Sequence, residues 1–208
     1  MSGEPDVIHP LRDEAFQLAE DLAAHILDHS NAYHALSGED AFPGRDRARF
    51  LILVTMFEEV GKLMALVREC EKAAKADYVN VRIEDFHDHC LNGRKAVAQI
   101  LEELRTVELA SLTLGRKDVR VSEEPAFVKE DFCSLRDRLL YLDADSKKRD
   151  LSFVPDGEQM DRYAEIIERN TLAASEYIHD LGRALGLWLQ LGRKARRTEG
   201  VLHSVRYL

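Results

Sequence analysis

Residues 50–67 carry the pattern that most restricts how this chain can fold. Large apolar side chains recur there in alternating steps of three and four residues, at Phe50, Leu53, Phe57, Val60, Met64 and Val67. Side chains spaced in this way lie on one face of an α-helix. That face is widened by Leu51, Val54 and Leu66. We therefore expect a central, largely buried helix that ends near residues 76–78.

Four further segments show helical patterns. A first helix is predicted over residues 10–34, where apolar side chains recur at Ala15, Leu18, Ala19, Leu22 and Ile26. It is followed by a break at residues 37–44, where Ser, Gly, Asp and Pro cluster. A third helix is predicted from residues 82–85 to about 112, and a shorter one over about 126–140. The last is predicted over 158–191, with its stripe at Ile167, Ala174, Ile178, Leu181, Leu185 and Trp188.

Amphipathic helices of this kind bury their apolar faces by packing on one another. The sequence therefore predicts an all-α fold: an up-and-down helical bundle with an irregular loop at residues 141–157, before the last long helix. A length of 208 residues fits one domain. We expect this domain to cover residues 1–192 and a basic tail to cover residues 193–208.

The charge of the chain restricts its partners. With a formal net charge of -9, the surface repels nucleic acid on average, so any contact with RNA needs a local basic patch. Such a patch can bind RNA phosphates, and it can equally be the solvated end of the last helix, where cations interact favourably with the helix dipole. The densest basic cluster is Arg193, Lys194, Arg196 and Arg197.

Other features of the sequence indicate a compartment. The three cysteines are widely spaced, which predicts no disulfide framework and fits a reducing environment. The first residues lack the basic and apolar regions of a signal peptide. The longest apolar run, residues 50–57, is interrupted at once by Glu58 and Glu59, so we expect no membrane span. These features predict a soluble cytoplasmic protein.

Two charged residues, Glu58 and Lys62, interrupt the most apolar helix. They are four residues apart and therefore neighbours on its surface. One interpretation is an exposed ion pair that contributes only about 0.3–0.5 kcal/mol, and the other is a shielded functional pair. Gly61 lies between them, where glycine costs a helix about 1 kcal/mol relative to alanine. A glycine at this position indicates that another backbone approaches closely.

The segment at residues 82–90 contains the side chains best suited to catalysis. In a regular helix Arg82 and His89 lie on nearly the same face, whereas an irregular start lets Arg82 pair with His87. RNA can be cut without a metal when a base removes the 2′-hydroxyl proton, which suits histidine, while arginine holds the phosphate. The structural alternative is a histidine that caps or packs the helix start beside a salt-bridged arginine.

Metal coordination is the weaker interpretation of the histidines. On a helix His87 and His89 point in nearly opposite directions. His25 and His29 have the i, i+4 spacing that can chelate zinc, but the first of them is not followed by the glutamate of a zinc hydrolase motif. We expect no metal and no cofactor.

The order of these motifs resembles a known family. FEEVGK at 57–62, FHDHCLNGRK at 86–95 and LRDRLLYLDAD at 135–145 are similar to segments of the abortive infection V (AbiV) family, part of the HEPN superfamily. The resemblance covers most of residues 12–157. It implies a HEPN-like helical bundle, usually a homodimer and often a ribonuclease toxin in phage defence.

The resemblance also implies roles for individual residues. HEPN nucleases carry an Arg followed after four to six residues by a His, and Arg82 fits this pattern with both His87 and His89. Many also carry a Glu-x3-Lys element, which Glu58 and Lys62 match. The implied catalytic residues are Arg82, His89 and His87. The residues implied to bind or orient the substrate are Glu58, Glu59, Lys62 and Lys95.

The leading hypothesis is therefore an antiphage effector that cleaves RNA, arrests translation on infection and is restrained by a phage-encoded or host protein. Ile83 follows Arg82, where HEPN nucleases commonly have a polar residue. This departure favours the alternative, a non-catalytic HEPN binding module that sequesters a protein or nucleotide partner.

Overall fold

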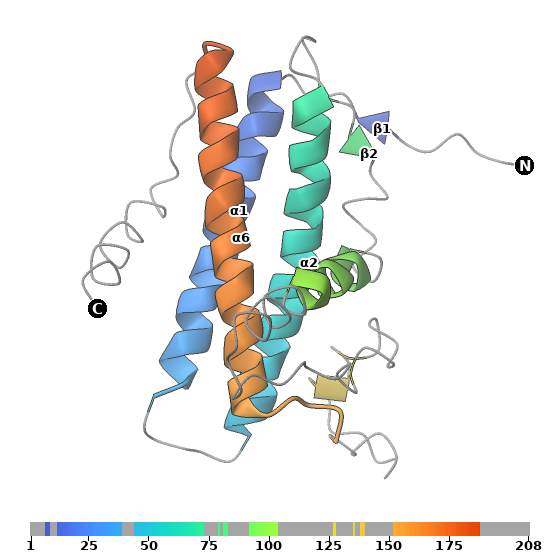
Figure 1. Ribbon diagram of the computed structural model, residues 1–208, viewed down its shortest axis with the longest axis vertical. Coiled ribbons are helices and arrows are strands. Elements are labelled where there is room, and N and C mark those ends of the chain that lie inside the picture. The colour runs from blue at the N-terminus through green and yellow to red at the C-terminus, as the bar shows by residue number, and fades with distance from the viewer. Residues whose placement is uncertain are drawn as a thin grey trace, which may run out of the picture.

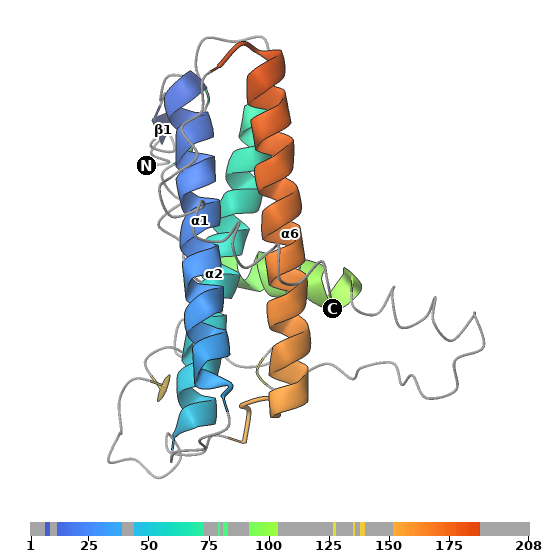
Figure 2. The same ribbon diagram turned by 90° about the vertical axis from the view of Figure 1, so that its left-hand side faces the viewer.

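The computed structural model describes residues 7–8, 12–38, 44–72, 79, 81–82, 92–103, 127, 135, 138–139 and 152–187. Three long helices lie side by side: α1 (Arg12–Leu36), α2 (Arg45–Lys72) and α6 (Gly157–Ala184) (Figure 1). A further helical segment, residues 92–103, lies across this bundle (Figure 1; Figure 2). The predicted all-α helical bundle is confirmed.

Side-chain contacts fix the directions of the long helices. Near the end of α1, the Tyr33 hydroxyl donates to Asp161 Oδ1 at 2.9 Å. Near its start, Glu20 Oε2 accepts from Ser175 Oγ at 2.9 Å. Since residue 161 precedes residue 175 on α6, α1 and α6 are antiparallel. Arg49, near the start of α2, also binds Asp161, so α2 and α6 run in the same direction, as Figure 1 shows.

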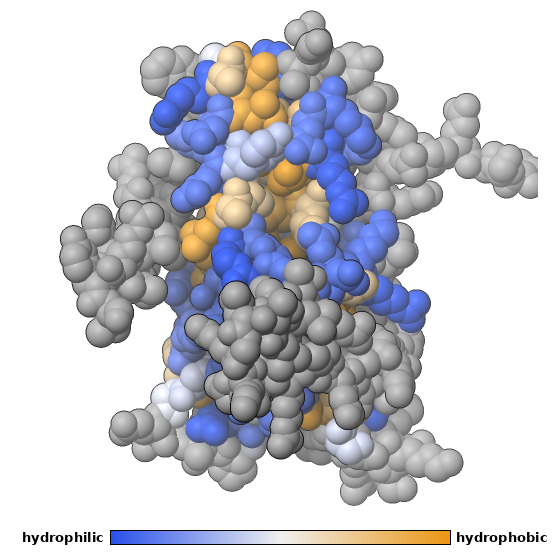
Figure 3. Space-filling view, in the orientation of Figure 1, coloured by the Kyte–Doolittle hydropathy of each residue, from blue (hydrophilic) through white to orange (hydrophobic). Residues whose placement is uncertain are grey.

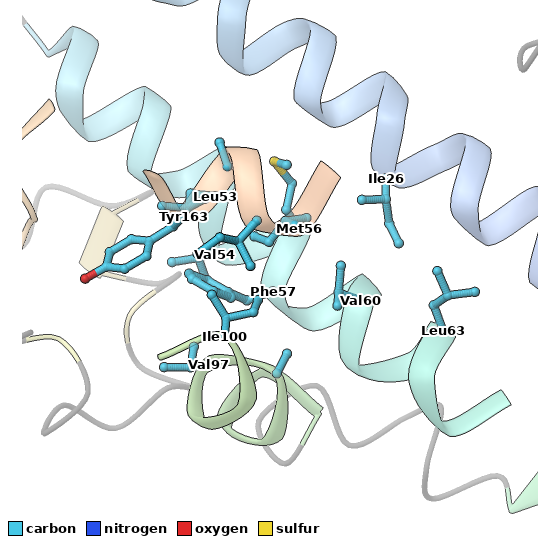
Figure 4. Packing of buried hydrophobic residues seen from close by; sticks show 14 of the residues in the cluster. Ile26, Leu53, Val54, Met56, Phe57, Val60, Leu63, Val97, Ile100 and Tyr163 are labelled. Atoms are coloured by element: carbon cyan, nitrogen blue, oxygen red, sulfur yellow. The ribbon is translucent and has the colours of Figure 1, made fainter. Parts of the chain in front are cut away.

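The core lies between these helices, and most of the circumference of α2 is buried. Val97 and Ile100 point from the segment 92–103 toward Val54 and Phe57 of α2, while Ile26 of α1 faces α2 further along (Figure 4). On the face seen in Figure 3, an apolar strip between α2 and α6 is bordered by hydrophilic residues. The stripe predicted for α2 is buried at Phe50, Leu53, Phe57 and Val60 and partly buried at Met64 and Val67.

The stripe predicted for α1 is wrong at Leu18, whose exposed fraction is 40%. Ala15, Ala19 and Ile26 of that stripe are buried as predicted. Phe16, Ala23 and Ser30 are buried as well, because this helix packs against α2 and α6 at once. Leu18 lies about 200° around the helix from Phe16 and therefore points away from both neighbours. Ala19 and the other small residues of α1 allow either face to be buried, so the apolar spacing alone was ambiguous.

The last helix ends at Ala184, so the predicted end near residue 191 is wrong. The backbone N–H of Leu187 donates to the carbonyl oxygen of Gly182 at 2.9 Å, as in the Schellman motif that closes many helices. Gly186 has a φ of 71°, a left-handed conformation that glycine adopts without steric cost. A glycine inside an apolar stretch was the signal for this end.

The amino-terminal end of α6 follows irregular residues. Asp156 caps the helix, since its Oδ1 accepts from the backbone N–H of Gln159 at 2.8 Å. Residues 152–156 agree with the irregular loop predicted at 141–157, and the rest of that loop lies outside the described residues. Most of the shorter helix predicted at 126–140 also lies outside them, although its side chains Phe127, Leu135 and Leu139 are buried.

The third predicted helix does not include Arg82. Strand β1 (Val7–Ile8) pairs antiparallel with strand β2 (Val81–Arg82), with Val7 opposite Arg82. A helix start at Arg82 is therefore wrong. The β-branched residues Val79 and Val81 around this point favour extended backbone. The pair lies beside the end of the bundle at which α2 ends (Figure 1; Figure 2), and residues 83–91 are outside the described part of the chain.

Candidate functional site

The middle of α2 buries several charges on one helical turn. Glu58 is 3% exposed and Lys62 is 9% exposed, which excludes the interpretation of these residues as an exposed ion pair. Lys62 Nζ lies 2.8 Å from Glu59 Oε1. The ion pair of Lys62 is therefore with the carboxylate three residues earlier, whereas the sequence predicted Glu58 as its neighbour. Three of the predicted substrate-binding residues thus share this turn.

A second ion pair on α2 has the same spacing as the pair of Glu59 and Lys62 but is much more exposed. Lys72 and Glu69 have the same spacing and lie 2.6 Å apart, with side chains that are 70% and 30% exposed. The corresponding values for Lys62 and Glu59 are 11% and 13%. Because water screens the inner pair much less, its charges interact more strongly, and losing one partner costs more.

Gly61 is in close contact with another backbone, as predicted. A Cβ atom added there would lie 2.2 Å from the carbonyl oxygen of Asn92 and 2.6 Å from its carbonyl carbon. Asn92 is fully buried and stands at the beginning of the described part of the segment 92–103. This segment therefore starts directly against the turn of α2 that holds Glu58 and Lys62.

The other end of this segment is fastened to α6. Glu103 Oε2 accepts from Asn170 Nδ2 at 2.8 Å, and its Oε1 is bound by Arg169. Lys95, a predicted substrate-binding residue, lies on the exposed side of the segment.

His25 of α1 reaches the same charges from the other side. Its Nδ1 lies 3.9 Å from Glu59 Oε2, and its imidazole is half exposed. The ring of His29 packs edge-on against it, with centroids 4.4 Å apart. Among the residues described, no group of three His, Cys, Asp or Glu side chains is arranged to hold a metal ion. The meeting of His25 with Glu59 depends on how α1 and α2 align, which the sequence pattern does not encode.

The remaining predicted site residues are not tested. The backbone of Arg82 is extended in β2, and its side chain lies outside the described atoms. His87 and His89 also lie outside the described residues. The same holds for the tail residues Arg193, Lys194, Arg196 and Arg197.

A polar cluster near the start of α2 had no signal in the sequence. Arg49 Nη2 donates to the Tyr33 hydroxyl at 2.7 Å and lies 2.5 Å from Asp161 Oδ1. Arg49 is buried, and its guanidinium lies over the Tyr33 ring. Burial is the largest cause that raises the pKa of the Tyr33 hydroxyl, and its hydrogen bond to Asp161 raises this pKa further. The cluster connects all three long helices.

Two further polar contacts join α1 to α6. His34 Nε2 lies 2.6 Å from Glu168 Oε1, which also accepts from Ser30 Oγ. The hydrogen bond with Glu168 raises the pKa of His34. Burial acts to raise the pKa of Glu168, but its hydrogen bonds with His34 and Ser30 hold it below the ordinary value. The second contact is the hydrogen bond that the buried carboxyl group of Glu20 accepts from Ser175 Oγ.

Comparisons of the chain with family models, curated proteins and solved structures found no match. Within the described residues, no helix has the length and apolar character needed to cross a membrane.

Proposed function

We propose that this protein is a metal-independent HEPN-type ribonuclease of antiphage defence, which cleaves RNA and arrests translation in the infected cell. The observation that carries the proposal is that Glu58 and Lys62 are buried, with the mostly buried Glu59 beside them, in a stretch of α2 (residues 50–67) that has no other charged residue. Burying charged groups costs more free energy than burying apolar residues in their place. Functional sites are among the places where proteins keep such groups.

The histidine segment precedes, by a few residues, the point at which the chain contacts this turn. Asn92 contacts α2 at Gly61, and His89 precedes Asn92 by only three residues. Even fully extended, three residues span about 11 Å. His89 and His87 are thus both joined to the α2 turn by a short stretch of chain, and both are candidates for the general base.

The chemistry follows from these residue types. His89 or His87 removes the proton from a ribose 2′-hydroxyl, whose oxygen attacks the adjacent phosphorus and displaces the 5′-oxygen of the next nucleotide. The products are a 2′,3′-cyclic phosphate and a 5′-hydroxyl end. Arg82 offsets the charge that develops on the phosphate, while Glu58, Glu59 and Lys62 orient Arg82 or the substrate.

Partners complete the proposal. Two copies of the chain form a homodimer that brings two Arg–His sets together across one cleft. A phage-encoded or host protein restrains the enzyme in the cytoplasm until infection. The RNA backbone is held by cationic side chains, for which the candidates are Lys95, Arg193, Lys194, Arg196 and Arg197.

Induced expression in bacteria tests the catalytic roles. We expect wild type to arrest translation and to leave 2′,3′-cyclic phosphate ends on cellular RNA. His89→Ala and Arg82→Ala should remove both effects at equal protein level. His179→Ala on α6 is the control and should remain toxic. Equal toxicity of His89→Ala, Arg82→Ala and wild type would refute the residue assignment.

The two ion pairs of α2 provide a matched test of the buried charges. Lys62→Met should lower RNA cleavage by at least about tenfold, because a desolvated charge that orients substrate contributes more than about 1.4 kcal/mol. Lys72→Met removes the same charge from the exposed pair and should leave cleavage within about twofold. Similar losses in the two variants would show that net charge alone determines activity.

One observation favours a second function, the non-catalytic binding module. The extended backbone of Arg82 in β2 does not correspond to the regular helix in which Arg82 and His89 share a face. A pulldown that recovers a stoichiometric protein or nucleotide partner, with no RNA turnover by the purified protein, would support this alternative.

A further inference from the structure

Two histidines lie on one face of α1, beside the charged turn of α2. His25 and His29 are four residues apart, so their side chains leave the helix on the same side. Their ring centroids are 4.4 Å apart, with an angle of 61° between the ring planes. The imidazole of His25 is half exposed and His29 is partly exposed. Dissolved ions can therefore reach both rings.

The separation of the two rings is close to that of two imidazoles on one metal ion. Zinc binds a histidine nitrogen at about 2.0–2.1 Å, so two rings that meet it at an angle of about 90–110° have centroids about 4.5–5 Å apart. The observed 4.4 Å is only slightly shorter. Small rotations about χ2, which is a soft torsion in histidine, would bring one nitrogen from each ring onto a shared ion.

A carboxylate from α2 lies behind the first ring. Glu59 Oε2 is 3.9 Å from His25 Nδ1, so this side of the imidazole faces the carboxylate and Nε2 is the nitrogen placed to bind an ion. Metal-binding histidines usually donate their second ring N–H to such a group, which fixes the orientation of the ring and raises its basicity. Lys62 Nζ lies 2.8 Å from the other oxygen, Glu59 Oε1, and holds the carboxylate in place.

The missing glutamate of the zinc hydrolase motif thus has a counterpart on another helix. No glutamate follows His25 in the chain, and for that reason the sequence favoured no metal at this pair. In the folded protein the carboxylate comes from α2 and serves to orient a ligand, so the direct protein ligands are the two imidazoles. A one-dimensional motif does not detect a carboxylate that is contributed across a helix interface.

From these contacts we infer that His25 and His29 form a binding site for a divalent transition metal ion, with Glu59 orienting His25. Water completes the coordination of the ion. Imidazole ligands favour Zn²⁺, Cu²⁺ and Ni²⁺, whereas Mg²⁺ and Ca²⁺ favour oxygen ligands. The inference concerns metal binding and goes beyond the proposed ribonuclease reaction, in which the metal has no part.

Calorimetric titration of the full chain, purified without a histidine tag, tests the site with Zn²⁺. The affinity should fall about 100-fold in His25→Gln and in His29→Gln, because each variant keeps one imidazole and loses the chelate. The control is His34→Gln, which removes a histidine of the same helix whose Nε2 contacts Glu168 at 2.6 Å, and it should leave the affinity within about twofold. Equal zinc affinity in wild type, His25→Gln and His29→Gln would overturn the inference.

Electron paramagnetic resonance of the Cu²⁺-loaded protein counts the nitrogen ligands. At one equivalent of Cu²⁺, wild type should show coupling to two imidazoles and each single variant should lose this signal. A wild-type spectrum with fewer than two imidazoles, or one that neither variant changes, would contradict the site.

A third variant tests the orienting carboxylate. Glu59→Gln keeps the shape of the side chain and removes its charge, so it should lower the Zn²⁺ affinity about tenfold while both imidazoles stay on Cu²⁺. If Glu59→Gln does not fold, Glu59→Asp replaces it and should lower the affinity because the shorter side chain retreats from His25. An unchanged affinity would refute the role of Glu59. None of these measurements uses RNA, so failure of the ribonuclease proposal leaves the metal site standing, and the reverse also holds.

Discussion

At the scale of single residues, the contact surface between α1 and α6 holds a carboxyl group that is unfavourable when charged. One oxygen of Glu20 accepts from Ser175, and the other has no hydrogen-bond partner within the described residues. Burial raises the pKa of Glu20 from its ordinary value of 4.5, against the hydrogen bond from Ser175. The contribution of Glu20 to stability is therefore complete below pH 4.5 and is lost as the pH rises through the folded-state pKa.

Replacing this group by its neutral analogue should stabilise the protein at neutral pH. We expect Glu20→Gln to raise the free energy of unfolding at pH 7 by about 1 kcal/mol, or roughly 2–4 °C in Tm for a domain of this size. The gain should shrink as the pH falls from 7 toward 4.5. Thermal unfolding between pH 4 and pH 8 measures it, with the exposed Glu176→Gln as the control. A gain independent of pH would contradict the argument from burial.

The pair of His34 and Glu168 has a stability window with two edges. The raised pKa of His34 means that its contribution is present below the ordinary value of 6.5 and is lost at higher pH. The lowered pKa of Glu168 means that its contribution is present above 4.5 and is lost at lower pH. The pair should therefore stabilise the fold most between pH 4.5 and pH 6.5.

A double-mutant cycle of His34→Gln and Glu168→Gln measures this window. Because His34 is half exposed, we expect a coupling of about 0.2–1 kcal/mol near pH 5.5 that declines toward pH 8 and toward pH 3.5. Denaturant unfolding at each pH provides the values. A coupling that stays constant over this range would show that the contact does not depend on charge.

At the scale of elements, the end of α6 depends on the backbone of one residue. Gly186 has a φ of 71°, and open space surrounds it, so Gly186→Ala adds strain without a clash. We expect a loss of about 1 kcal/mol in unfolding free energy, and a smaller loss for Gly186→Asn, since asparagine tolerates this conformation. Thermal unfolding of both variants is compared with Gly38→Ala, where φ is not positive. Equal stability of Gly186→Ala and wild type would contradict the role of the motif.

The elements also show what apolar spacing can and cannot predict. The stripe of α2 contains only large side chains, so one face is unambiguous and its burial was predicted correctly. In α1, alanines lie on several faces, and Leu18 could not be assigned to the core before the neighbours of the helix were known. Gly186 was the residue that indicated the end of α6, and a search based on apolar residues alone does not consider it.

At the scale of the whole molecule, one cluster connects the three long helices. Arg49 of α2 binds Tyr33 of α1 and Asp161 of α6. We expect Arg49→Met to lower the free energy of unfolding by about 2 kcal/mol, less than for a fully buried pair because Asp161 is half exposed. Tyr33→Phe should cost about 1 kcal/mol.

Denaturant unfolding by circular dichroism and by fluorescence measures these losses in one experiment. The control, Arg162→Met, removes an exposed ion pair with Glu158 and should cost less than about 0.5 kcal/mol. Two separate transitions in Arg49→Met, or a loss no larger than in the control, would show that the cluster does not connect the helices energetically.

The candidate site could be read from the sequence only where its members share one helix. Glu58 and Lys62 were recognised because they are charged residues in an apolar stretch. The close approach of another backbone at Gly61 was predicted because glycine is unfavourable inside a helix. Whether Lys62 pairs with Glu58 or Glu59 depends on side-chain rotamers. The position of His25 beside Glu59 depends on how α1 aligns with α2. Those are tertiary properties, which a one-dimensional pattern does not determine.

The pairing of β1 with β2 has a practical consequence for work on this protein. Two residues on each strand join the beginning of the chain to Arg82 across the whole of α1 and α2. So short a strand pair is only marginally stable, and trimming the chain up to Ile8 leaves β2 without its partner. The position of an affinity tag, or of a protease cut, is therefore a variable in every measurement made on Arg82.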